Sequence, residues 1–276
     1  MNTTLNKCIG LPSLTIVRNT LLASSFWIAG ALQPSSGETI YSANFEPPTF
    51  ADNVALFLQD GWNAPPALSP AAAVVTNDKP RQGKQTVRVK GTDLVAEEFI
   101  NQATSGYYAA IGSYRRPVNY DTGGTQTVRI SAHVRIDGPQ SSAGDNFYSA
   151  GISGRVATTF EGGPSNASVG ELVISSDGNA YAYSGNDLVP TILASVPVTL
   201  GEWHDLAVVA DFANQTSDFY VDGQLLTTIA WDPLEVSTGV LLRGTLHAYA
   251  APDTASHQKA DYESTYDKFS IKATGK

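Results

Sequence analysis

One run of the sequence alternates apolar and polar side chains in a way that could gather chemically active groups on a surface. In a β-strand, successive side chains point to opposite faces. The run Gln126–Ile136 therefore predicts one apolar face, made of Val128, Ile130, Ala132, Val134 and Ile136. The opposite face would carry Arg129, Ser131, His133 and Arg135. A later run, Val240–Ala250, would present Thr245, His247 and Tyr249 in the same way.

These polar side chains are of the types that eliminative cleavage of an acidic polysaccharide requires. An Arg neutralises the uronate carboxylate, a His or Tyr removes the C5 proton, and a Tyr protonates the leaving oxygen. The candidate catalytic residues are Arg129, His133, Arg135, His247 and Tyr249. A lyase would need His133 and either His247 or Tyr249 on one face, within one sugar's length. The alternative is an exposed face of a half-buried sheet, where Arg and His have no catalytic role.

The elements that would position these residues are strands. Runs rich in Val, Ile, Thr and Tyr alternate with clusters of Gly, Asn, Asp or Pro, which is typical of short strands joined by turns. No segment keeps an apolar period of 3.6 residues over three turns, and at most a short helix is expected around Thr92–Ala103. This pattern predicts an all-β fold, a two-sheet antiparallel sandwich or jelly roll. The expected strands are Thr39–Phe45, Ala72–Thr76, Gln85–Lys90, Tyr107–Tyr114, Gln126–Ile136, Phe147–Arg155, Gly170–Ser175, Ala180–Ser184, Trp203–Phe212, Thr216–Leu226, Val240–Ala250 and Tyr262–Lys272.

Three motifs in order point to a known superfamily. The centre reads Trp203-His204-Asp205-Leu206, then, after a polar gap, Tyr220-Val221-Asp222-Gly223, where Asp-Gly predicts a tight hairpin turn. The opening holds Phe45-Glu46 and Gly61-Trp62, and the closing reads Asp267-Lys268-Phe269-Ser270-Ile271. Together they resemble secreted bacterial concanavalin A-like jelly rolls of the laminin-G-like type. The resemblance implies paired terminal strands and a fold that usually handles sugars outside the cell.

The glucanases of that superfamily use two carboxylates about 5 Å apart on one strand, as Glu-x-Asp-x-Glu or Glu-x-Asp-x-x-Glu. Neither motif occurs in this sequence. Glu97 and Glu98 are adjacent, so on a strand they would face opposite ways. A Gly-x-Ser-x-Gly elbow for serine hydrolysis is also absent. These absences argue against a glucanase and a serine hydrolase.

Loops rich in Asp, Asn and Gly, next to Tyr, could bind the hydroxyls of a sugar while the rings stack on its C–H faces. Two such loops follow one another in the sequence. The candidate ligand-binding residues are Asp177, Asn179, Tyr181, Tyr183, Asn186 and Asp187. Buried Tyr residues in a sandwich core are the alternative.

A structural Ca²⁺ is a further expectation. The resemblance places Glu46, Asp60 and Asp267 near the paired termini, and Ca²⁺ is a hard cation that takes carboxylate and carbonyl oxygens. The alternative is that these acids cap turns or accept hydrogen bonds from buried backbone donors.

The N-terminal part of the chain differs from the rest. A basic flank, the apolar run Leu21–Leu32 and the small residues Ala29-Gly30-Ala31 predict a signal peptide over residues 1–37 and one domain over residues 38–276. An N-terminal helix packed on the domain is the alternative. Cys8 is the one cysteine and would leave with the signal, so a mature chain would hold no disulfide. We therefore expect secretion, to the periplasm or beyond.

The net charge of −9 and the lack of a basic run argue against a nucleic-acid partner. Twelve apolar residues are too few to span a bilayer, and no later run is longer, so no membrane span is expected in the mature chain. The sequence thus predicts a secreted module that binds a polysaccharide, a glycoconjugate or another extracellular ligand. A polysaccharide lyase and a structural or adhesion module remain the alternatives.

Overall fold

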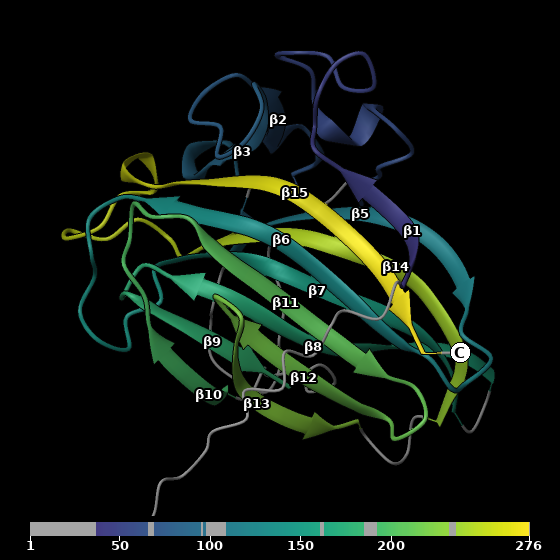
Figure 1. Ribbon diagram of the computed structural model, residues 1–276. Coiled ribbons are helices and arrows are strands. Elements are labelled where there is room, and N and C mark those ends of the chain that lie inside the picture. Colours follow the sequence, from purple (N-terminus) through teal and green to yellow (C-terminus); the bar gives the residue numbers. More distant parts are fainter. Residues whose placement is uncertain are drawn as a thin grey trace, which may run out of the picture. The chain divides into compact units, whose positions relative to one another are not determined.

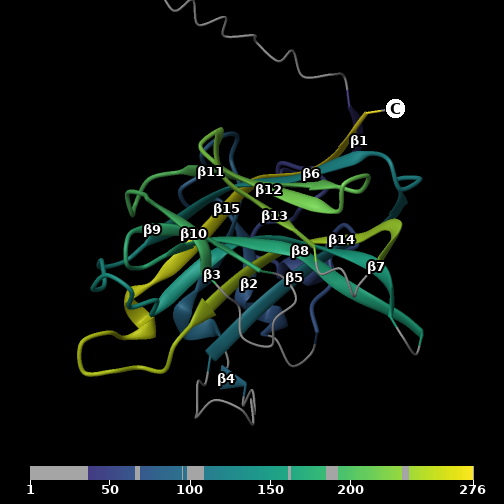
Figure 2. The same ribbon diagram turned by 90° about the horizontal axis from the view of Figure 1, so that it is seen from below.

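Two antiparallel sheets pack face to face within the compact unit Pro34–Lys276 (Figure 1). The computed structural model describes residues 37–65, 69–94, 96–97, 109–160, 163–184, 192–231 and 236–275. Figure 2 shows the two layers nearly edge-on, with β6, β11 and β12 in one and β5, β8 and β14 in the other. The predicted all-β sandwich is therefore confirmed. The predicted signal peptide lies outside the described residues, apart from Gly37, and stays a prediction.

Sheet A has the strand order β13-β12-β11-β6-β15-β3-β2, with β1 also paired to β15. Its strands are β1 (Glu38–Ala43), β2 (Ala73–Thr76), β3 (Thr86–Lys90), β6 (Thr127–Asp137), β11 (His204–Asp211), β12 (Thr216–Val221), β13 (Gln224–Ala230) and β15 (Glu263–Thr274).

Sheet B has the order β10-β9-β8-β7-β14-β5-β4. Its strands are β4 (Ala96–Glu97), β5 (Ala109–Asp121), β7 (Tyr148–Phe160), β8 (Gly163–Ser175), β9 (Asn179–Tyr183), β10 (Ile192–Pro197) and β14 (Val236–Ala250). Short 3₁₀ turns lie at Leu56–Leu58, Pro70–Ala72, Gly91–Asp93 and Lys259–Asp261. Among the described residues, no helix is long and apolar enough to cross a bilayer.

The interior between the sheets is built by strict alternation along the central strands. In β6, Val128 to Ile136 at every second position are buried, as the sequence predicts, while Arg129 and its neighbours face outward. In β14, Leu246, Ala248 and Ala250 are buried on the inner face of sheet B. Full burial of each large aliphatic side chain contributes roughly 1.5–3 kcal/mol. The other side chains of each strand, which are mostly polar, point to the outer face of their sheet. The two outer faces lie on opposite sides of the sandwich.

The two ends of the domain meet, as the superfamily resemblance implies. Strand β1 pairs with β15 so that Ala43 lies opposite Phe269. A cluster of aromatic rings packs the loop that follows β1 against strand β15. Trp62 packs edge-on against Phe269 with ring centroids 5.1 Å apart, and its indole N–H donates to the hydroxyl of Tyr41 at 2.9 Å. Phe45 and Phe269 are completely buried.

Some expected elements differ in the structure. The run Thr216–Leu226 is not one strand but a hairpin, because Asp222 and Gly223 both take positive φ and turn the chain between Val221 and Gln224. Strand β10 was not predicted from the sequence, since it is a largely exposed edge strand without a clear apolar alternation. The expected helix around Thr92–Ala103 does not form over its described part, which is a 3₁₀ turn followed by the short strand β4.

Gly170 provides a test of how tightly the two sheets pack. It has φ +101°, and a Cβ at this position would lie 2.3 Å from Cζ of Phe219 on the facing sheet. We expect Gly170→Ala to lower the free energy of unfolding by roughly 1–3 kcal/mol more than Gly123→Ala. Gly123 is the matched control, because it also has positive φ (+61°) but no atom lies within 4 Å of the added Cβ. Urea unfolding of both variants measures the difference. Equal losses of unfolding free energy in the two variants would contradict tight packing of Gly170 against Phe219.

Candidate functional site

The outer face of sheet B gathers the densest set of polar side chains in register. We call this set the sheet-B face. One row crosses five neighbouring strands in the order Tyr183, Glu171, Ser153, Thr245, Arg115. The rows on either side contribute further members, namely Arg155, Arg243, His247 and Tyr249.

Three arginines on this face lie close enough to repel one another. Arg155 and Arg243 are directly opposite on β7 and β14, and Arg115 stands in the next row on β5. Burial, together with Arg115 and Arg155, lowers the pKa of Arg243 to about 10. Burial and Arg155 also lower the pKa of Arg115. No carboxylate of the described residues lies within ion-pair distance of the three, and Nε of Arg243 is buried without a hydrogen-bond partner there.

Beside the arginines, one acid–base pair is held below the surface. Nε2 of His247 lies 3.0 Å from Oε1 of Glu171, although β7 runs between their strands. The residue opposite His247 on β7 is Gly151, so no side chain blocks the path. Burial raises the pKa of Glu171, but His247, the Tyr249 hydroxyl and Arg155 outweigh it and hold the pKa below its usual range. Glu171 is therefore ionised at neutral pH.

Two tyrosines on this face keep their protons. Burial and Glu171 raise the pKa of Tyr183, and the same two causes raise that of Tyr249 well above its ordinary value. Both hydroxyls therefore act as neutral hydrogen-bond donors and acceptors at pH 7. Their rings offer flat apolar surface on the face that also carries the arginines, a combination that suits the C–H face and charged substituent of a sugar acid.

Strand β8 does not carry the pair of carboxylates that the glucanase motif would place on one strand face. Residues two apart on a strand share a face, so Glu171, Val173 and Ser175 occupy the three positions of a Glu-x-Asp-x-Glu arrangement. Only the first of them is a carboxylate. Glu171 lies beside His247, and the two following positions on the same face of β8 are the apolar Val173 and the hydroxyl residue Ser175.

The structure does not bring together the five residues considered for a lyase. His247 and Tyr249 lie on the sheet-B face, but Arg129, His133 and Arg135 lie on the outer face of sheet A, because their β6 neighbours fill the interior. Arg135 is moreover paired with Asp137 at 2.6 Å. A cleft lined by His133 and His247 is therefore not formed.

The predicted sugar-binding loops are partly outside the described residues, since Asn186 and Asp187 are not among them. Asp177 is 3% exposed and accepts hydrogen bonds from the backbone N–H groups of Gly144 and Asn179. It also accepts a 2.5 Å bond from the hydroxyl of Tyr181, whose pKa is raised to about 12 by burial and this carboxylate. Asp177 thus stabilises its own turn. Tyr181 and Tyr183 both lie on the sheet-B face, Tyr181 in the row of His247 and Tyr183 in the row of Glu171.

The three acids considered for Ca²⁺ accept hydrogen bonds at two different places. Glu46 accepts from the backbone of Lys84 and Gln85, and Asp267 accepts from the backbone of Gln82, so both hold the same loop. Asp60 instead accepts from the hydroxyl of Tyr41 at 2.6 Å. No group of three or more His, Cys, Asp or Glu within the described part of the chain is arranged to hold a metal ion.

Five members of the sheet-B face were missed in the sequence, namely Arg115, Ser153, Arg155, Glu171 and Arg243. Each is a single polar residue in a strand whose neighbours give no motif. Their signal is the alternation itself: Arg243, Thr245, His247 and Tyr249 fall on one face of β14. What the alternation cannot supply is the strand order, which brings β5, β7 and β8 beside β14.

Comparisons with known proteins identify the fold. The sequence matches no family model and none of the curated proteins. An endo-1,3-β-glucanase from Streptomyces sioyaensis has a similar structure, with a TM-score of 0.60 over 88% of this chain and 99% of that chain, at 12% identity. Two further structures are less similar. The carbohydrate recognition domain of Emp47p has a TM-score of 0.47 at 10% identity and covers 87% of this chain and 97% of that chain. A family 7 alginate lyase has a TM-score of 0.44 at 12% identity and covers 72% of this chain and 80% of that chain. At such identities the likeness extends to the fold alone, a concanavalin A-like jelly roll.

Glu171→Gln tests the buried acid–base pair. The pKa of Glu171 is held below its usual range, so the stability it contributes is present at neutral pH and lost as the pH falls through its folded pKa. We expect the variant to be about 1–2 kcal/mol less stable than the parent at pH 7, and we expect this deficit to shrink as the pH falls through the folded pKa of Glu171. Thermal unfolding across this pH range measures the difference. Glu202→Gln, at an exposed site, is the control, and a deficit that does not depend on pH would contradict the ion pair.

Proposed function

We propose that this protein binds an acidic polysaccharide across the sheet-B face. The observation that carries the proposal is the set of Arg115, Arg155 and Arg243, none of which is in ion-pair contact with a carboxylate of the described residues. Like charges that are partly removed from water cost free energy unless an opposite charge compensates them. A ligand with carboxylate groups would supply that charge, and guanidinium groups bind carboxylates through two parallel hydrogen bonds.

The other residues of the face fit the same ligand. The rings of Tyr183 and Tyr249 offer stacking surface. The hydroxyls of Ser153 and Thr245 lie in the same row as Arg115, between the row of Arg243 and the row of His247. Glu171 carries the one carboxylate found in these rows of β7, β8 and β14, and its Oε1 lies 3.0 Å from Nε2 of His247. The chain is acidic overall, with a net charge of −9, so a cationic face is a local specialisation and not a reflection of composition.

We further propose that the protein acts outside the cell and belongs to the laminin-G-like branch of the fold. The signal-like N-terminus supports the location, and the order of the three motifs along the chain supports the branch. A structural or adhesion module without a glycan site is the alternative, and the arginines of the sheet-B face count against it.

A second candidate function is elimination on the same polysaccharide. It is favoured by the presence of the arginines, His247 and Tyr249 on one face, which provide charge neutralisation and protonated or protonatable groups. It is disfavoured by the burial of His247, which is 3% exposed and directed at Glu171. Tyr249 would then have to serve as the proton-transferring group.

The binding proposal predicts that affinity depends on charge in both partners. Calorimetry with polygalacturonate should give saturable binding that weakens as NaCl rises, because salt screens exposed charges. A neutral β-1,3-glucan should bind at least about tenfold more weakly. Arg243→Met should reduce binding by about tenfold or more. The same variant should unfold at the parent's temperature or above it, because it removes mutual repulsion among the arginines.

The matched control is Arg135→Met, which removes an arginine from the opposite outer face, where Asp137 already pairs with it. It should leave binding unchanged. If both variants bind like the parent, or if the neutral glucan binds as tightly as the acidic one, the sheet-B face is not the glycan site.

An assay for the reaction product distinguishes the lyase alternative from simple binding. Elimination creates an unsaturated uronate, so incubation with polygalacturonate or alginate would raise the ultraviolet absorbance. We expect no rise above a heat-inactivated sample. A rise that is abolished in Tyr249→Phe, while binding is retained, would show that the protein is a lyase and that Tyr249 transfers the proton.

A further inference from the structure

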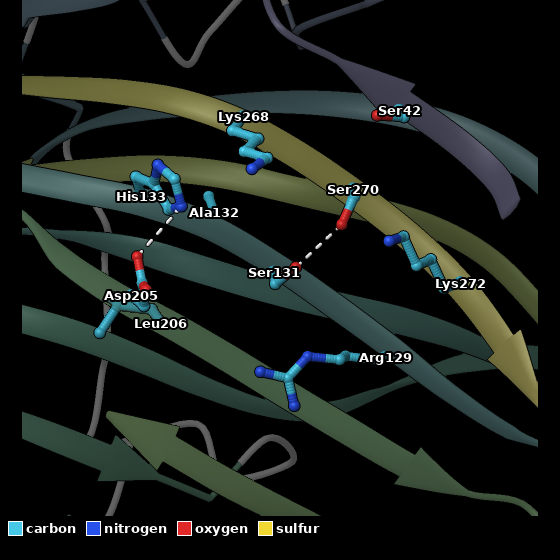
Figure 3. A pocket seen from close by; sticks show the side chains of 10 residues that line it. All are labelled: Ser42, Arg129, Ser131, Ala132, His133, Asp205, Leu206, Lys268, Ser270 and Lys272. Atoms are coloured by element: carbon cyan, nitrogen blue, oxygen red, sulfur yellow. Dashed lines mark hydrogen bonds and ion pairs between the residues drawn. The ribbon is translucent and has the colours of Figure 1, made fainter. Parts of the chain in front are cut away.

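The outer face of sheet A holds a second polar pocket, on the opposite side of the sandwich from the sheet-B face. Its volume is about 210 Å³. The pocket is lined by Ser42, Arg129, Ser131, Ala132, His133, Asp205, Leu206, Lys268, Ser270 and Lys272, which come from β1, β6, β11 and β15 (Figure 3). We call it the sheet-A pocket.

Three hydroxyls form the floor of the sheet-A pocket. Ser42, Ser270 and Ser131 are consecutive in register across β1, β15 and β6. The hydroxyls of Ser131 and Ser270 are hydrogen-bonded to each other at 2.9 Å. Each hydroxyl keeps further capacity to donate or accept, so the floor can offer hydrogen bonds to a small polar group.

Cations flank this floor on both sides. Lys272 lies directly opposite Arg129 in the pairing of β15 with β6. Like charges directly opposite in an antiparallel pair destabilise a sheet. Burial lowers the pKa of Arg129, whose guanidinium packs 5.5 Å from the centre of the Tyr220 ring. Neither Arg129 nor Lys272 has an ion-pair partner among the described residues.

On the other side of the floor, Lys268 is displaced from the ladder by a bulge between Asp267 and Ser270. Its backbone has φ +52°, a left-handed conformation that is unfavourable for a residue with a long side chain. Figure 3 shows its amine above the strands on the side of His133, away from Arg129 and Lys272. Lys268 has one weak contact, 3.4 Å from Nζ to the amide oxygen of Gln82.

The one carboxylate that lines the sheet-A pocket, that of Asp205, is already paired with other side chains. Oδ1 of Asp205 lies 3.1 Å from Nε2 of His133, and the same oxygen is paired with the guanidinium of Arg81. Burial, Arg81 and Lys268 lower the pKa of His133 despite Asp205. Three cations therefore surround a hydroxyl floor without a free counter-charge.

We propose that the sheet-A pocket binds a tetrahedral oxyanion, a sulfate or phosphate group, either free or as a monoester. Hydroxyl donors below and cations on two sides match a group whose oxygens point in several directions, whereas a planar carboxylate would engage only one side. The inference stands apart from the proposed function, because none of these residues belongs to the sheet-B face.

Histidine resonances can test the two faces separately. The chain contains 4 His, of which His133 lines the sheet-A pocket and His247 lies on the sheet-B face. In an NMR titration with inorganic sulfate at constant ionic strength, the His133 signal should move and saturate. Phosphate should act in the same way, and a sugar monosulfate tests whether an esterified group also fits. Acetate should bind at least about tenfold more weakly.

Lys272→Met should weaken sulfate binding at His133 by about tenfold or more without lowering the unfolding temperature, since it relieves the repulsion from Arg129. Lys84→Met, at an exposed lysine outside the pocket, is the matched control and should bind like the parent. Arg243→Met should also leave the His133 response intact, even if the sheet-B face fails to bind glycan. A His133 shift that does not saturate, that acetate reproduces, or that survives in Lys272→Met would overturn the proposal.

Discussion

The strands of both sheets share one apolar interior, and this constraint governs where every polar group can lie. Each central strand sends alternate side chains into the layer between the sheets, so its remaining side chains must point to one of two outer faces. The interior is packed closely enough that Gly154 and Gly244 stand where a Cβ would meet Ile130 or Phe269 of the other sheet. Because neither sheet can turn over without exposing this layer, the identity of each outer face is fixed along with the core.

This constraint divides the cationic groups of an acidic protein into two separate sites. On the sheet-B face, Arg115, Arg155 and Arg243 come from three adjacent strands, and on the sheet-A pocket Arg129 and Lys272 meet across one strand pair. In both places, charges of one sign are held together, and burial lowers the pKa of Arg115, Arg243 and Arg129, whereas Lys272 is exposed. Such arrangements cost stability, and it is this cost, not an enrichment of basic residues in the composition, that supports the proposal of an anionic ligand at each of them.

The acidic residues divide into those that stabilise the fold and those that adjust a site. Asp177, Asp267 and Glu46 accept hydrogen bonds from backbone N–H groups of nearby loops, which is a structural role. Glu171 and Asp205 instead lie beside histidines on the two outer faces. Residue type alone does not separate the two groups, since all five are carboxylates on or near strands of similar composition.

The sequence by itself determined the class of fold, the burial of alternate residues in β6, the hairpin at Asp222-Gly223 and the meeting of the two ends. The first three features depend on neighbouring residues, through strand periodicity and turn chemistry, whereas the meeting of the ends was implied by the resemblance that the order of motifs carries. Only the tertiary structure decided which polar residues share a face. His133 and His247 occupy equivalent outward positions in their strands, yet they lie on opposite sides of the sandwich, whereas Glu171 reaches His247 across Gly151. Pairing between strands distant in sequence sets these neighbours, and periodicity within a strand carries no information about which strand lies next to it.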